Sequence, residues 1–99
     1  MEHAYKTLLT GEIAGTITAV QMPDIPCSKV KLKAVRSNSG NVYIGREGVT
    51  KVAGGANNET AGFELDAGED TDWLVIDNLN KLWRICDNAG DELVYIIQR

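Results

Sequence analysis

Apolar and polar residues alternate along short stretches of this chain, and residues typical of turns separate the stretches. The clearest stretch is 29–35, where Lys29, Lys31 and Lys33 alternate with apolar residues. Because successive side chains of a strand point to opposite faces, this stretch predicts a strand with one charged and one buried face. Alternation together with β-branched and aromatic residues predicts further strands at 14–20, 42–44, 63–65, 72–76, 81–86 and 92–97.

The spacing of these strands predicts the fold class. They recur roughly every 8–12 residues with glycine, proline, asparagine or aspartate between them, a spacing typical of sandwiches and barrels. No segment has a sustained helical period with caps. We therefore expect an all-β protein, a compact single-domain antiparallel β-sandwich or barrel that is jelly-roll-like. The 99 residues predict one domain at 13–99, preceded by an N-terminal arm or edge strand at 1–12.

The inward-facing positions of these strands predict the core. They are Val30, Leu32, Val42, Ile44, Phe63, Leu65, Leu74, Ile76, Leu82, Ile85, Val94 and Ile96. Two sheets packed about 10 Å apart would bury these side chains. Alternation does not assign Trp73 or Trp83 to a face, because each has an apolar neighbour in its strand. A second covered face favours contact with another subunit, so both tryptophans are candidate subunit contacts in a dimer or trimer.

Charge is unevenly distributed along the chain. Residues 1–51 contain seven basic and four acidic residues, a net charge of +3, whereas residues 52–99 contain three and ten, a net charge of −7. A chain with an overall charge of −4 and no basic, aromatic-rich surface argues against nucleic-acid binding. The lysines of 29–35 form either a solvated strand face or a face that docks on an acidic protein. No stretch has the apolar length of a membrane helix or the pattern of a signal peptide.

The residues that carry chemistry are sparse. The only histidine is His3, and the acidic residues of 64–72 do not have the spacing of a twelve-residue calcium loop. Cys27 and Cys86 are far apart in the chain, with no CxxC pair or Cys/His cluster to hold zinc. The two cysteines are either free thiols or one disulfide. We expect a non-enzymatic protein without a cofactor or a metal site.

Six segments in a fixed order resemble a known module. They are VQMP at 20–23, CSKV at 27–30, NSGNVYIG at 38–45, GFELDAGE at 62–69, DNLNKLW at 77–83 and AGDELVY at 89–95. Over about residues 18–97 this series is similar to a small β-sandwich module of tailed-bacteriophage virion proteins, in which NxGNVYVG, GxxLxAGE and DLNxLY recur in this order. The chain departs from the module at Trp83, where the module often has tyrosine, and in a long loop at 51–61.

The resemblance implies a structural protein of the virion. We favour a capsid decoration (cement) protein, because the chain consists of the module and about twelve further residues, without a trimeric shaft. The alternatives are a receptor- or surface-binding module of a tail or head fibre, and a connector or tail-completion protein. The implied partners are the phage major capsid protein and further copies of this chain, on the capsid surface after synthesis in the host cytoplasm. The candidate capsid-contact residues are Tyr5, Leu8, Leu9, Ile13, Lys29, Lys31 and Lys33.

Overall fold

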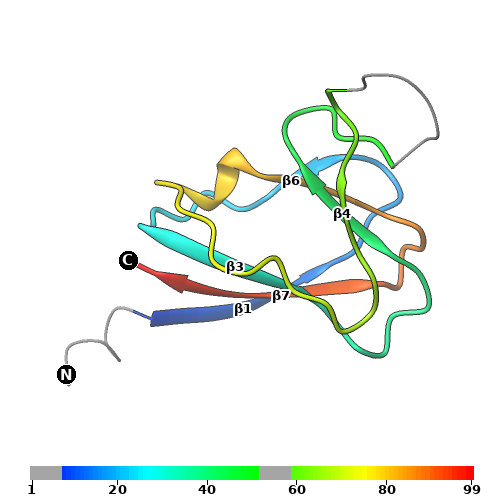
Figure 1. The fold of residues 1–99 in the computed structure, drawn as a ribbon, viewed down its shortest axis with the longest axis horizontal. Coiled ribbons are helices and arrows are strands. Elements are labelled where there is room, and N and C mark those ends of the chain that lie inside the picture. Colours follow the sequence, from blue (N-terminus) through cyan, green and yellow to red (C-terminus); the bar gives the residue numbers. More distant parts are fainter. Residues whose placement is uncertain (1–7, 52–58) are drawn as a thin grey trace.

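Two antiparallel sheets face one another in the computed structural model, which describes residues 8–51 and 59–99 (Figure 1). The first sheet has the order β1 (Leu8–Ala14), β7 (Glu92–Gln98), β3 (Lys29–Ala34). The second has the order β2 (Val20–Gln21), β6 (Trp83–Cys86), β4 (Val42–Gly45), β5 (Phe63–Leu65). A single turn of 3-10 helix, η1 (Leu79–Lys81), precedes β6. The protein is therefore all-β, as predicted, and forms a small β-sandwich that does not close into a barrel.

The core lies between the two sheets. Its largest fully buried side chains come from β3, β4, β5, β6 and β7, from η1 and from the segment after β2. They include Met22, Val30, Leu32, Val42, Leu65, Leu79, Leu93 and Ile97. The alternation predicted for 29–35 is confirmed in β3, because Val30, Leu32 and Ala34 are completely buried while the lysines between them are not.

The prediction of a strand at 14–20 is wrong. Residues 8–14 form β1, and only Val20–Gln21 pairs beyond it, as β2. β1 belongs to one sheet and β2 to the other, so the segment between them crosses the sandwich instead of extending a strand. The crossing is tight at Gly15, where a side chain would collide with the backbone carbonyl of Asp91.

The N-terminal strand is part of the sheet and not an appendage to it. β1 pairs with β7 along all of its seven residues, from Leu8 opposite Gln98 to Ala14 opposite Glu92. β1 is an edge strand of the first sheet, and the boundary expected between residues 12 and 13 falls inside it. Residues 1–7 and most of the loop expected at 51–61 lie outside the described residues.

The strand predicted at 72–76 is also absent as a regular element. Residues 69–74 instead follow the free edge of β3, joined to it by backbone hydrogen bonds such as Thr71 N to Leu32 O (2.8 Å) and Leu74 N to Val30 O (2.7 Å). Asp72 interrupts the pairing because its φ of 64° lies in the left-handed region. Only isolated bridges therefore form here, and the segment covers the β3 edge without becoming a strand.

Alternation assigned several core residues to the wrong face. Ile85, Val94 and Ile96 were predicted to be buried, but they are half-buried, and the buried positions are Arg84, Cys86, Leu93 and Ile97. Strand β7 carries apolar residues on both faces, so alternation could not choose between two registers one residue apart. In β6 the buried face carries Arg84, which alternation assigns to the solvent side. Phe63 was expected in the core but is 64% exposed, and Leu74, Ile76 and Leu82 are half-buried residues packed against the core.

Candidate docking surfaces

The lysine row of β3 lies on the outward side of the first sheet, and Trp73 covers part of it. The ammonium groups of Lys29 and Lys31 lie 4.6 Å and 5.5 Å from the centre of the Trp73 ring. Cation–π attraction at such distances contributes roughly 0.5–1 kcal/mol at exposed sites. Two of the three lysines are thus held by a neighbour within the chain, and Lys33 is the exposed one of the three.

We call this side of the β1–β7–β3 sheet the outer face. Its centre is an apolar floor. Val94 and Ile96 of β7 lie between Thr10 and Glu12 of β1 on one side and the lysines of β3 on the other. A depression of about 550 Å³ runs over this floor. Glu12 is the charged residue of the β1 side, which we call the acidic rim. The three lysines follow the β3 side, the basic rim, where Asp70 also lines the depression.

The two tryptophans proposed as subunit contacts lie in different parts of the sandwich. Trp73 is 37% exposed beside β3, whereas Trp83 is half-buried at the start of β6 in the second sheet. The structure therefore does not bring them together on one sheet.

The proposed N-terminal contact residues have different exposures. Leu8 and Leu9 are 36% and 38% exposed, so both can reach a neighbouring molecule. Ile13 is 8% exposed and belongs to the core, so its proposed role as a capsid contact is wrong. Tyr5 lies outside the described residues.

An apolar depression that the sequence did not predict opens between the sheets. It has a volume of about 410 Å³ and is lined by Ile44, Gly45, Phe63, Thr71, Leu74 and Leu82. We call it the apolar seam. Phe63 lies opposite Ile44 in the β4–β5 pair, and therefore on the inward side. Among the described residues β5 is the edge strand of its sheet, and the Phe63 side chain is 64% exposed. A large, exposed aromatic side chain beside an apolar hollow is a typical protein-contact feature.

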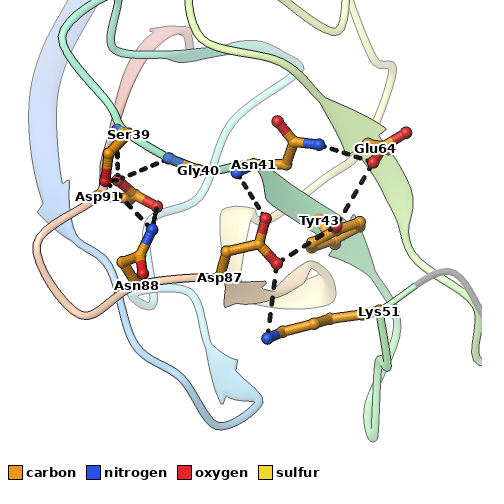
Figure 2. A network of polar contacts seen from close by, with 9 residues as sticks. All are labelled: Ser39, Gly40, Asn41, Tyr43, Lys51, Glu64, Asp87, Asn88 and Asp91. Carbon is orange, nitrogen blue, oxygen red and sulfur yellow. Dashed lines mark hydrogen bonds and ion pairs between the residues drawn. The ribbon is translucent and has the colours of Figure 1, made fainter.

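A buried carboxylate, Asp91, holds the turn after β3 against the turn before β7 (Figure 2). Asp91 is 1% exposed and accepts hydrogen bonds from the backbone N–H of Ser39 (3.0 Å) and of Gly40 (3.4 Å). Its other oxygen accepts from Asn88 Nδ2 at 3.3 Å. Nearby, the Asn38 side chain donates to the Glu92 carbonyl (2.9 Å) and accepts from the Glu92 N–H (2.8 Å).

A second part of this network surrounds Asp87 (Figure 2). Asp87 accepts from the backbone N–H of Asn41 at 2.9 Å, and Lys51 Nζ lies 3.5 Å from its other oxygen. The Asn41 hydrogen bond and, to a smaller extent, Lys51 lower the pKa of Asp87. Tyr43 donates toward both Asp87 and Glu64 at 3.4 Å, and burial is the main cause that raises its pKa. These contacts join β4, β5 and the β6–β7 turn.

The remaining motif segments also form turns that position strands. Asn78 caps η1 by accepting from Asn80 N (2.9 Å) and also accepts from Ile25 N (3.1 Å). In the 66–69 turn, Glu69 accepts from Asp66 N at 2.8 Å, and Gly68 adopts a φ of 88°. The motifs therefore have a physical role in this chain, which is to fix the corners of the sandwich.

Arg84 is a buried cation that the sequence analysis did not identify. Its side chain is directed inward from β6 and donates to the carbonyls of Ala14 and Gln21, both at 3.2 Å. Burial lowers the pKa of Arg84 below its ordinary value, and it forms no ion pair with a described carboxylate. Arg84 thus connects the end of β1 to β2. Its signal in the sequence was weak, because arginine inside a strand usually lies on the solvent side.

The cysteines are free thiols, which decides between the two possibilities left open by the sequence. Cys86 is buried in the core, and Cys27 is half-buried and donates to the Ile76 carbonyl at 3.4 Å. Burial is the main cause that raises both thiol pKa values. Neither thiol therefore has the lowered pKa of a reactive cysteine.

The acidic residues of 64–72 are used in local hydrogen bonds. Asp70 accepts from Asp72 N (2.8 Å), and Glu64 accepts from Asn41 Nδ2 (2.7 Å). Within 8–51 and 59–99, no group of three or more His, Cys, Asp or Glu side chains is arranged to hold a metal ion. The described part of the chain also contains no helix with the length and apolar character needed to cross a membrane.

Comparison with known proteins identifies no relative, since no protein-family model, no curated protein and no solved structure matches the chain.

Proposed function

We propose that this protein is a non-enzymatic structural component of a tailed-bacteriophage virion, a decoration protein that binds the assembled head and stabilises it. The observation that carries the proposal is the agreement between the motif series and the fold. The motifs resemble a β-sandwich virion module, and in this chain they form the turns that lock a β-sandwich: Ser39 and Gly40 against Asp91, and Asn78 at η1.

Stabilisation of a shell needs a contact surface and no bond chemistry. A protein that binds the assembled head but not its free subunits favours the assembled state by mass action. We assign the contact to the apolar seam, where Phe63 is 64% exposed beside Leu74 and Leu82. An apolar side chain of the major capsid protein would fill the seam and cover the Phe63 ring.

A surface-binding module is the weaker candidate. Such a module stacks a ligand on an exposed aromatic ring, and Trp73 is the exposed tryptophan. However, the ammonium groups of Lys29 and Lys31 already lie over its ring. A connector protein remains distinguishable by its location, since it would occupy one ring of the particle instead of the whole shell.

The test is addition of purified protein to phage particles assembled without it, followed by a count of bound copies by electron microscopy. We expect binding over the whole shell, and strongly reduced occupancy for Phe63→Ser. The matched control is Ile17→Ser, which removes a side chain of similar exposure, 60%, outside the seam. Binding to a single ring, or no binding by the folded protein, would contradict the proposal, and equal occupancy of both variants would place the contact elsewhere.

A further inference from the structure

We propose that the outer face of the β1–β7–β3 sheet binds the same face of a second copy of this chain, with a twofold axis running along β7. The proposal rests on the register of the sheet and does not depend on a role in a virion.

Three rows of side chains cross the outer face, each centred on a β7 residue. From one end of the sheet to the other, they are Leu8–Gln98–Lys29, Thr10–Ile96–Lys31 and Glu12–Val94–Lys33. In each row the left-hand residue comes from β1 and the right-hand residue from β3. The third row therefore has a carboxylate at one end, an apolar residue in the middle and an ammonium group at the other end.

A rotation of 180° about an axis parallel to β7 exchanges the two rims without moving any residue along the strands. It places β1 of one copy over β3 of the other, as in face-to-face packing of aligned sheets. Glu12 of each copy then faces Lys33 of the other copy, and Val94 meets its own counterpart at the axis. The row becomes two ion pairs that flank an apolar contact.

Within residues 8–51 and 59–99, the charges of this row have no ion-pair partner. Glu12 and Lys33 are on strands separated by β7, so their backbones lie two strand spacings apart, about 9.5 Å. Neither residue forms an ion pair among the described residues. On the acidic rim, hydrogen bonding to and repulsion from Glu12 raise the pKa of Glu92. A lysine from a second copy would relieve this repulsion. On the basic side, Asp70 lines the depression beside Lys33.

The first row is also complementary under the same rotation. Leu8 is 36% exposed on the β1 rim, and the rotation places it over Lys29 of the other copy, next to the Trp73 ring. The middle row sets Thr10 against Lys31, a neutral pairing. None of these three rows places like charges opposite one another. Glu92, which lies one pair further along β7 opposite Ala14, meets its own counterpart at the axis, and this like-charge contact weakens the dimer.

The size of the face predicts a weak dimer. A sheet region of seven residues by three strands measures about 23 by 14 Å, so the contact is smaller than a standard interface of roughly 1,600 Å². We therefore expect self-association that becomes visible at high protein concentration and is weakened by salt, because ion pairs at a small interface remain partly screened.

Charge reversal tests the pairing of rims. We expect Glu12→Lys and Lys33→Glu each to raise the dimer dissociation constant about tenfold or more in sedimentation equilibrium at low salt, because each places like charges opposite one another. An equimolar mixture of the two variants should associate again, since the heterodimer restores both ion pairs. The control is Glu47→Lys, the same charge change in the exposed turn after β4, which should leave the constant unchanged.

The mixture distinguishes contact between copies from an effect within one chain. Val94→Lys provides a second test, because it places two ammonium groups at the axis and should abolish the dimer. Circular dichroism confirms that each variant is folded. The proposal is overturned if the folded wild-type protein stays monomeric up to about 1 mM, the upper end expected for weak association. It is equally overturned if the reversals have no effect or if the mixture does not associate.

Discussion

Replacement of Asp91 by alanine tests the polar lock that joins the 38–41 turn to the β6–β7 turn. The carboxylate is 1% exposed and accepts from the N–H of Ser39 at 3.0 Å, that of Gly40 at 3.4 Å and Asn88 Nδ2 at 3.3 Å. A hydrogen bond to a charged group contributes about 1.5–3 kcal/mol, and the two longer contacts contribute less. We therefore expect Asp91→Ala to lower the free energy of unfolding by about 3 kcal/mol, a large part of the 5–15 kcal/mol typical of a domain.

Urea denaturation followed by tryptophan fluorescence measures this change, and thermal melting should show a fall of about 12–24 °C. Asp91→Asn is the matched variant, because it keeps an acceptor for Ser39 and loses only the charge, so a loss of about 1 kcal/mol is expected. Asp77→Ala is the surface control. Asp77 forms an ion pair with Lys81 at 3.6 Å on side chains that are 81% and 64% exposed, and such pairs contribute about 0–1 kcal/mol. If Asp91→Ala lowers the free energy of unfolding no more than Asp77→Ala does, the hydrogen bonds of Asp91 do not stabilise the fold.

Three further predictions concern single residues. Gly68→Ala should lower the free energy of unfolding by about 1–2 kcal/mol, because the φ of Gly68 is 88°. Gly90→Ala should leave it nearly unchanged in the same denaturation assay, because Gly90 has open space around it and no positive φ. A thiol reagent at pH 8 should modify Cys27 before Cys86 in the native protein, since Cys86 is the buried one; equal rates would show that the core opens readily. The raised pKa values of the Cys27 and Cys86 thiols stabilise the folded protein. This stability is fully present below the ordinary thiol pKa of 9.0 and is lost as pH rises through the pKa of the folded state. The lowered pKa of Asp87 adds stability that is present above its ordinary value of 3.8 and lost as pH falls through the folded value. Asp87→Asn should therefore lose less stability than wild type on acidification, and parallel pH curves would contradict this.

The sequence contained enough information for the fold class and for part of the core. Strand β3 was predictable because its alternation is unambiguous, and its buried residues Val30 and Leu32 follow directly. The turn residues were also predictable from their composition. The contacts that these turns make were not predictable, because Asp91 and Ser39 are more than fifty residues apart in the chain.

The candidate surfaces depended on tertiary structure to a greater extent. Three of the contact residues chosen from sequence, Lys29, Lys31 and Trp73, lie together because residues 69–74 follow the edge of β3. Ile13 was chosen as a contact and is a core residue. The apolar seam had no signal in the sequence, because its lining comes from segments that meet only at one opening of the sandwich.

The sequence by itself therefore determined the strands with a clear period, the corners between them and the absence of a helical pattern, since these depend on neighbouring residues. Only the tertiary structure decided which face of β7 is buried, because both of its faces are apolar and the choice depends on the strands beside it. It also decided that β6 buries Arg84 and Cys86 and not Trp83 and Ile85, although alternation predicts Ile85 in the core. It also decided that Glu12, Val94 and Lys33 share one row across the outer face. A row of this kind is set by the register of three strands that are distant in the chain, and no local pattern encodes it.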